Sequence, residues 1–407
     1  MLRKNTFCLE SFFICVFSFF YLVVPILYLF SFQELKENSY NFWVVKTELS
    51  FESMFWVFFI YLLSTISLFS GLYLGKKVVV RVGDFSDRKK SIFFYFLIFV
   101  SLFSSLITLV YIYKVGGVVP AIVNANLYRA HGVMEPPVGQ WSKFQPYILY
   151  TSLLLMCYKS RIKYLFVVVA VVYLFIEASR ANFGMYFIVL YLLYLNENHK
   201  FSFKKLLLPA IFVFLLAFLG NSITNFIETG EWSLYSSAYY GAISQFSPTF
   251  SNVLNIKEYT EQMGFGFFYD LTSIFPQTAF GIPKTVKTWE LLTVYYLGGF
   301  YTVGIPIDLF SYGFSQFSFF GSFALPFSYG VLLGLGIKYL KAIRFKSGDF
   351  KLAYGIELIM CLFALSILNW ASLDSTVFYG TSKYWLLLLV FYLVSKLRLG
   401  DFKGASH

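Results

Sequence analysis

Long apolar runs recur along this chain, and most of them end at a short segment that carries lysine or arginine. An α-helix needs roughly 20 apolar residues to cross about 30 Å of hydrocarbon. Charged residues make up only 13% of the chain, about half the share found in soluble domains. That share is too small to cover a water-facing surface. The pattern therefore predicts an all-α polytopic integral membrane protein, with residues 1–407 as a single transmembrane domain.

About ten runs qualify as transmembrane helices. They cover residues 11–30, 53–75, 92–113, 146–158, 164–179, 181–195, 206–223, 319–337, 352–370 and 384–396. The first run is longer than the apolar stretch of a signal peptide, and no small-residue cleavage site follows it, so we expect it to be retained. An even number of spans places both termini on one side of the membrane.

The positions of the basic residues give the orientation. Lysine and arginine resist translocation, so the cytosolic segments of a membrane protein carry an excess of both. If the N-terminus is cytosolic, 22 of the 32 basic residues fall in cytosolic segments. We therefore expect both termini in the cytosol. Because these charges are spread over several short segments, the net charge of +11 indicates contact with anionic lipid of the bilayer and no nucleic-acid partner.

Two segments on the far side are longer than a connection requires, residues 114–145 and residues 224–318. Loops longer than about 15 residues are usually functional or disordered. The second loop is rich in aromatic residues and poor in charge, which is not the composition of disorder. We expect it to form short helices at the membrane interface, with 236–256 and 265–280 as the candidates.

Arg180 lies between two short spans, 164–179 and 181–195. Each is about 22 Å long as a helix, which is less than the hydrocarbon thickness. We therefore expect their connecting turn to lie below the outer surface. An arginine at that depth usually faces an internal cavity and a partner. One interpretation makes Arg180 an anion ligand; the other has it reach outward or pair with Glu177.

The first outer loop carries a second set of candidates, Arg129, His131 and Glu135, beside aromatic and amide residues. Such side chains bind sugars and transfer protons, although each is also an ordinary solvated loop residue. The three histidines are far apart and the four cysteines form no CxxC pair, so we expect no metal site. Sequence motifs of ATPases, metalloproteases, hydrolases and dinucleotide-binding enzymes are absent.

Three stretches resemble the Wzy family, the oligosaccharide repeat-unit polymerases of bacterial surface polysaccharides. Residues 124–129 are similar to the start of that family's first periplasmic loop. Residues 178–182 resemble its Ser-Arg-small turn, and residues 313–334 resemble its exit from the large loop. The resemblance also covers most of the chain as an architecture with many spans, many aromatic residues and two enlarged periplasmic loops, 114–145 and 224–318.

The resemblance implies a GT-C-like fold in the bacterial inner membrane and an O-antigen polymerase activity that needs neither metal nor cofactor. The partners would be undecaprenyl-diphosphate-linked glycans and, in addition, a membrane protein that regulates chain length. Arg180 and Arg129 would bind the diphosphate, and Glu135 or His131 would act as the base. The expected sugar-binding residues are Tyr128, Asn126 and Asn182.

Some features depart from this family. Residues 224–318 contain no arginine, so a second basic ligand must be Arg129 or a lysine. The same loop contains no histidine, which disfavours the related O-antigen ligases. A flippase or exporter of a lipid-linked glycan stays an alternative because it would also place an arginine in a cavity. Transporters commonly show internal repeats, and none is visible in this sequence.

Overall fold

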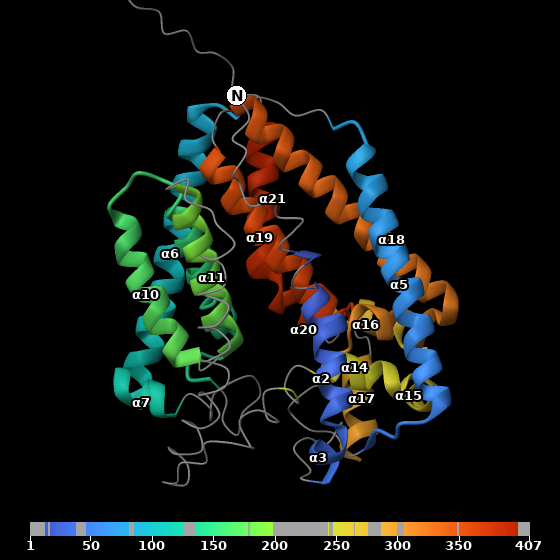
Figure 1. Ribbon diagram of the computed structural model, residues 1–407. Helices are drawn as coiled ribbons and strands as arrows, with labels where there is room; N and C mark the ends of the chain where they lie inside the picture. Colours follow the sequence, from blue (N-terminus) through green and yellow to red (C-terminus); the bar gives the residue numbers. More distant parts are fainter. Residues whose placement is uncertain are drawn as a thin grey trace, which may run out of the picture.

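We analysed a computed structural model of the chain (Figure 1). The structure describes residues 13–14, 17–37, 46–80, 85–124, 136–177, 180–197, 243, 247–263, 265–275, 286–298, 305–347 and 350–397. Within these ranges the protein is all helical and contains no strand. The predicted all-α class is therefore confirmed for the described residues.

Four described helices are long and apolar enough to cross a membrane. They are α5 (Phe51–Lys77), α6 (Asp87–Val115), α18 (Leu309–Ser347) and α19 (Phe350–Asn369). Leucine, isoleucine and phenylalanine side chains on α5 and α6 are exposed, as expected for helices that face lipid. The protein is thus a membrane protein, as its composition predicts.

Shorter helices occupy most of the other predicted spans. They are η1 (Phe19–Val23), α2 (Val24–Phe30), α9 (Tyr147–Leu155), α10 (Ile162–Glu177), α11 (Arg180–Glu197) and α21 (Ser382–Lys396). The predicted span 206–223 lies outside the described residues. The nine residues of α9 extend only about 14 Å. Helix α9 is therefore too short to cross the hydrocarbon core by itself. All nine residues are buried among neighbouring helices, so α9 does not face lipid. The count of ten spans stays a prediction.

The charged helix ends gather at one end of the molecule, which we call the basic end. Lys89 of α6 donates to the Ser395 carbonyl of α21 at 2.9 Å. Tyr158, just beyond α9, donates to the Lys90 carbonyl at 3.2 Å. The Tyr339 hydroxyl of α18 is hydrogen-bonded to the Ser395 hydroxyl. These contacts place the ends of four helices together, as expected from the alternation of the predicted spans. We call the opposite end of the molecule the loop end (Figure 1).

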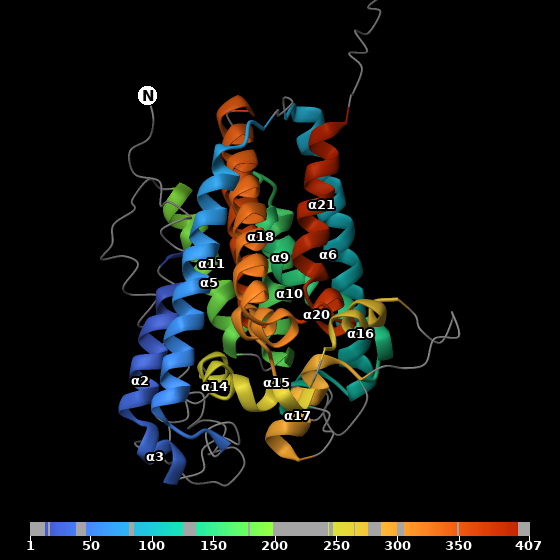
Figure 2. The same ribbon diagram turned by 90° about the vertical axis from the view of Figure 1, so that its right-hand side faces the viewer.

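Helices α5 and α18 pack closely along their length (Figure 2). Gly71 and Gly75 of α5 meet Gly330 and Gly334 of α18, and a Cβ atom on any of the four would overlap the backbone of the other helix. Helix backbones approach this closely in membranes because close contact maximises dispersion attraction where no hydrophobic effect operates between helices. The small-xxx-small spacing therefore marks a real helix contact.

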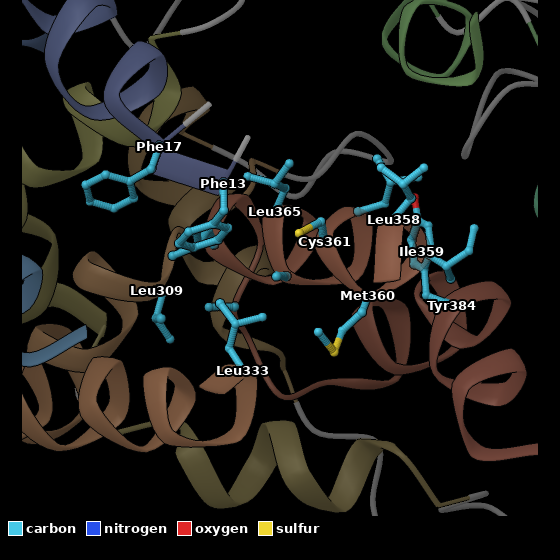
Figure 3. Close-up of a cluster of buried hydrophobic side chains, with 14 of the residues drawn as sticks. Phe13, Phe17, Leu309, Leu333, Leu358, Ile359, Met360, Cys361, Leu365 and Tyr384 are labelled. Atoms are coloured by element: carbon cyan, nitrogen blue, oxygen red, sulfur yellow. The ribbon is translucent and has the colours of Figure 1, made fainter. Parts of the chain in front are cut away.

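Helix α19 lies in the centre of the molecule. Figure 3 shows its side chains Leu358, Met360 and Leu365 pointing to different sides. Leu333 of α18 and Phe13 of the N-terminal segment lie close to this cluster (Figure 3). Helix α19 is buried on nearly all sides. A helix in such a position carries apolar side chains on every side rather than on one face.

Helix α18 is interrupted near its start. Phe317 and Ser318 have non-helical backbone angles, and Ser318 has a positive φ of 54°. Gly313 and Gly321, on either side of the break, are in backbone contact. An unbroken helix would hold them about 12 Å apart, so the chain turns sharply here. The predicted span 319–337 begins at this break, and the helix continues ten residues further, to Ser347.

Short helices cover the loop end. Those of the large outer loop are α14 (Pro248–Leu254), α15 (Ile256–Met263), α16 (Phe267–Ser273) and α17 (Thr288–Leu297). The others are α3 (Phe32–Glu37), α7 (Val118–Val123), η2 (Gly139–Phe144) and α20 (Ser375–Gly380). Helix α14 lies within the predicted range 236–256 and α16 within 265–280, so short helices in these ranges are confirmed for the described residues. Helices α15 and α17 are additions, and a position at the membrane interface stays a prediction.

Candidate functional site

Most predicted site residues fall outside the part of the chain that the structure describes. Asn126, Tyr128, Arg129, His131 and Glu135 belong to residues 125–135, which are not described. Arg180 is the first residue of α11, and only its backbone is described. Asn182, two residues further along α11, is described with its side chain.

The turn between α10 and α11 joins two polar side chains. Glu177 ends α10, and the Asn182 amide nitrogen donates to its Oε1 atom at 2.8 Å. Arg180 lies between these two residues in the chain. Asn182 therefore helps to fix the Glu177 carboxylate beside the start of α11. The partner of the Arg180 side chain stays a prediction.

A cluster of buried tyrosines surrounds Glu177. Tyr173, one helical turn earlier on α10, hydrogen-bonds to the Glu177 carboxylate. Tyr150 of α9 lies close enough for the Glu177 charge to act on it. The Tyr150 hydroxyl also forms a 2.8 Å hydrogen bond with the hydroxyl of Tyr384 on α21. Four helices thus contribute to one buried polar cluster, and we call these residues the tyrosine cluster.

A cation lies at the edge of the tyrosine cluster. The Lys383 ammonium is 5.5 Å from the ring centre of Tyr150 and 5.4 Å from that of Tyr384. Lys383 is half-buried and forms no ion pair with any described residue. Aromatic rings attract a cation but do not neutralise its charge. The Lys383 ammonium can therefore also attract an anion.

The tyrosine cluster lies beneath a cover at the loop end. Ile176, next to Glu177, packs with Ile107 and Tyr111 of α6, with Ala121 of α7 and with Val138. Helix α7 therefore lies beside the end of α10 at Glu177, at the loop end (Figure 1). The 16 residues of α10 extend about 24 Å, close to the length expected from the sequence. The depth of this turn in a bilayer stays a prediction.

The buried tyrosines and Lys383 were not among the residues predicted from the sequence. The four-residue spacing of Tyr173 and Glu177 places both on one helix face and could have signalled their association. No sequence signal links either residue to Tyr150 or Tyr384, because Tyr150 lies on another helix and its hydrogen bond with Tyr384 joins residues that are 234 positions apart. Lys383 lies near the start of α21. Because residues 224–318 contain no arginine, it is a further lysine that could serve as the second basic ligand.

A second buried carboxylate lies in the outer loop. Asp270 of α16 accepts hydrogen bonds from the Thr288 amide (2.8 Å), the Thr288 hydroxyl (2.5 Å) and the Tyr312 hydroxyl (3.0 Å). Burial raises the pKa of Asp270 to about 6, against the effect of the Thr288 donors. These bonds join α16, α17 and α18. We interpret Asp270 as a structural residue because both of its oxygens have partners.

The described residues contain no group of three or more histidine, cysteine, aspartate or glutamate side chains that could hold a metal ion. No family model, no curated protein and no solved structure matches this chain.

Proposed function

We propose that this protein joins undecaprenyl-diphosphate-linked oligosaccharide repeat units into a surface polysaccharide, an O-antigen or a capsule. The observation that supports this proposal is the tyrosine cluster at the outer ends of α9, α10, α11 and α21. It combines a carboxylate, an amide, phenolic hydroxyls and a lysine within a largely apolar protein. A site that binds a sugar attached to a lipid diphosphate needs polar and cationic side chains close to lipid.

The reaction is glycosyl transfer between two lipid-linked glycans. A hydroxyl oxygen of the acceptor repeat unit attacks the anomeric carbon of the donor chain. The new bond from carbon to oxygen forms as the bond from that carbon to the diphosphate oxygen breaks. Undecaprenyl diphosphate leaves with the electron pair, and the acceptor proton passes to a base.

Arg180 carries most of the charge stabilisation in this proposal. Negative charge develops on the diphosphate as it leaves, and positioned cations stabilise that charge most strongly in a site shielded from water. A planar guanidinium suits phosphate oxygens better than an ammonium does. Arg129 of the first outer loop and Lys383 are the candidates for the second cation.

Three carboxylate or imidazole groups are candidates for the base. Glu135 and His131 follow from the family resemblance, and Glu177 is added by its place in the tyrosine cluster. Asn182 and, in the undescribed loop, Asn126 and Tyr128 would bind sugar hydroxyls. The base must lie within hydrogen-bond reach of the acceptor hydroxyl.

The proposal includes an orientation. The basic end would face the cytosol with both termini, and the loop end would face the periplasm across a bacterial inner membrane. The long apolar helices support a site next to the bilayer, from which a lipid-linked substrate would approach. A membrane protein that regulates chain length is an additional expected partner.

Replacing Arg180 by alanine tests the proposal in cells. We expect the variant to leave single repeat units on the lipid-linked acceptor and no long polymer. Arg161→Ala is the matched control, because Arg161 is an exposed arginine in the turn before α10, at the basic end. Long chains from the Arg180 variant at a normal protein level would remove Arg180 from the site.

The two alternative functions give different results when purified protein is incubated with a lipid-linked repeat unit. A flippase or exporter would form no new glycosidic bond. A ligase-like glycosyltransferase would transfer the glycan to a different acceptor and would not extend it.

A further inference from the structure

A second polar cluster lies at the loop end, on the other side of α19 from the tyrosine cluster, and is centred on Asp308. This residue directly precedes α18 and is completely buried. Its Oδ2 atom accepts from the backbone amides of Phe310 (3.1 Å) and Ser311 (3.2 Å). Its Oδ1 atom has no hydrogen-bond partner among the described residues. One half of the carboxylate therefore caps a helix, and the other half lacks a partner.

Side chains from four further elements lie around the start of α18, and the rings of Tyr21 and Tyr61 pack against Phe310 with ring centres 4.8 and 6.0 Å away. Tyr21 of η1, Tyr61 of α5 and Tyr259 of α15 each lie close enough for the Asp308 charge to act on them. The Tyr61 hydroxyl is buried and has no hydrogen-bond partner in the described structure. On α14, the Asn252 amide nitrogen donates to the Pro306 carbonyl at 2.8 Å, whereas its oxygen is unpartnered. Buried polar atoms rarely lack a partner, and the Tyr259 and Ser311 hydroxyls are two further examples among the described residues.

The charge at this cluster is negative. Asp308 forms no ion pair with any described lysine, arginine or histidine. The Tyr21 hydroxyl donates to the carbonyl of Leu368 at 3.1 Å, in the last turn of α19. A helix C-terminus carries a partial negative charge. The positive N-terminus of α18 is already engaged by Oδ2, so the Oδ1 side has no described counter-charge.

An ionised Asp308 carboxylate would be fully buried and would have no cationic partner among the described residues. A buried charge without a partner is costly, and either a cation or ordered water must reduce that cost.

The donor atoms select the kind of cation. Carboxylate, hydroxyl and amide oxygens are hard ligands, which suit alkali and alkaline-earth ions rather than transition metals. Calcium sites usually contain several carboxylates, and this cluster has one. We propose that Asp308, Tyr61 and Asn252 bind one monovalent alkali cation, sodium or potassium, between the outer-loop helices and the spanning helices. This inference does not depend on the proposed enzymatic activity.

Such a cation would hold together elements that are far apart in the chain. Its ligands come from α5, from α14 and from the start of α18, and Tyr21 and Tyr259 would lie around it. Because the unfolded chain cannot assemble this site, cation binding should stabilise the folded protein. The stabilisation should reach a plateau as the cation concentration rises. General screening of surface charges by salt has no such plateau.

The test is thermal unfolding of the purified full-length protein in a neutral detergent. Sodium chloride or potassium chloride replaces N-methyl-D-glucamine chloride at constant ionic strength, and intrinsic fluorescence follows the unfolding. We expect one of the two ions to raise the midpoint by about 2–5 °C in a saturable manner. Equal midpoints in all three salts would overturn the proposal and would assign the cluster to ordered water.

Two variants and a control locate the effect. Asp308→Asn should abolish the response to the cation. Tyr61→Phe keeps the ring and removes only the unpartnered hydroxyl, so the fold should persist and the half-saturating concentration should rise several-fold. Asp374→Asn is the control: Asp374 is an equally buried helix cap, but both of its oxygens are hydrogen-bonded. It should lower the midpoint and keep the response. An unchanged half-saturating concentration in Tyr61→Phe would contradict the assignment, even if Asp308→Asn fails to fold.

Discussion

Two buried aspartates lie at the loop end, Asp270 and Asp308, and they differ in the hydrogen bonds that their neighbours donate. Both of the Asp270 oxygens accept hydrogen bonds from described residues, and only one of the Asp308 oxygens does. The pKa of each is raised to about 6 by burial. Of the two residues, only Asp308 therefore has a carboxylate oxygen without a described hydrogen-bond donor.

The raised pKa of Asp270 predicts a pH dependence of stability. An unfolded aspartate has a pKa of about 3.9. The folded protein therefore holds this proton more tightly, and the resulting stabilisation is complete below about pH 3.9 and is lost as the pH rises through about 6. At a fixed sodium concentration, we expect a higher free energy of unfolding at pH 5 than at pH 7.

Asp270→Asn should reduce this difference by on the order of 1–2 kcal/mol. Chemical denaturation at the two pH values measures the difference. An equal difference in wild type and variant would show that Asp270 does not titrate in this range.

Lys383 is the residue whose proposed role is most easily isolated. Lys383→Ala should lower polymerisation about 10–1000-fold, because one positioned cation is lost from the developing diphosphate charge. Lys383→Arg should retain most of the activity, because it keeps the charge and the contact with the aromatic rings. Product chain length in cells, at matched protein levels, measures both. Full activity of the alanine variant would restrict the second cation to Arg129.

At the scale of elements, the contact between α5 and α18 is the clearest case in which spacing in the sequence predicts packing. Gly75→Ala should destabilise the protein by about 1–3 kcal/mol, because the added methyl group meets the α18 backbone rather than a movable side chain. Gly380→Ala at the end of α20 is the matched control, since a Cβ atom there meets nothing within 4 Å. Thermal unfolding in detergent compares the two, and equal midpoints would contradict the close contact.

The sequence was sufficient to predict most helices but not how they end or bend. Apolar runs gave α5, α6, α10, α11, α19 and α21 to within a few residues at most ends, because lipid imposes a length and a composition on a span. The break at Ser318 could not be predicted, since it depends on the contact between Gly313 and Gly321 across the bend. The shortness of α9 likewise depends on its burial by its neighbours.

The site was predictable only in part, for the same reason. Arg180 could be predicted because an arginine between two apolar spans is costly, and Asn182 because the turn around it resembles a family motif. Tyr150 and Tyr384 did not, because a tyrosine in a span is ordinary and its hydrogen bond becomes visible only after folding. The partnerless oxygens of the Asp308 cluster are also a tertiary property.

At the scale of the whole molecule, the orientation can be tested by labelling. Gln140 near the loop end and Lys159 near the basic end are exposed and flank α9. In a variant without the native cysteines, Gln140→Cys should react with an impermeant maleimide on intact spheroplasts. Lys159→Cys should react only after lysis. Labelling of both on intact cells would show that α9 does not connect the two faces of the membrane.

The most direct test of the proposed function is polymerisation by the purified protein. We would incubate it with an undecaprenyl-diphosphate-linked repeat unit, without added divalent metal, and separate the products on a gel. We predict a ladder of products spaced by one repeat unit, and loss of that ladder in Arg180→Ala but not in Arg161→Ala. A folded protein that forms no new glycosidic bond from the repeat unit of its own host would contradict the proposal.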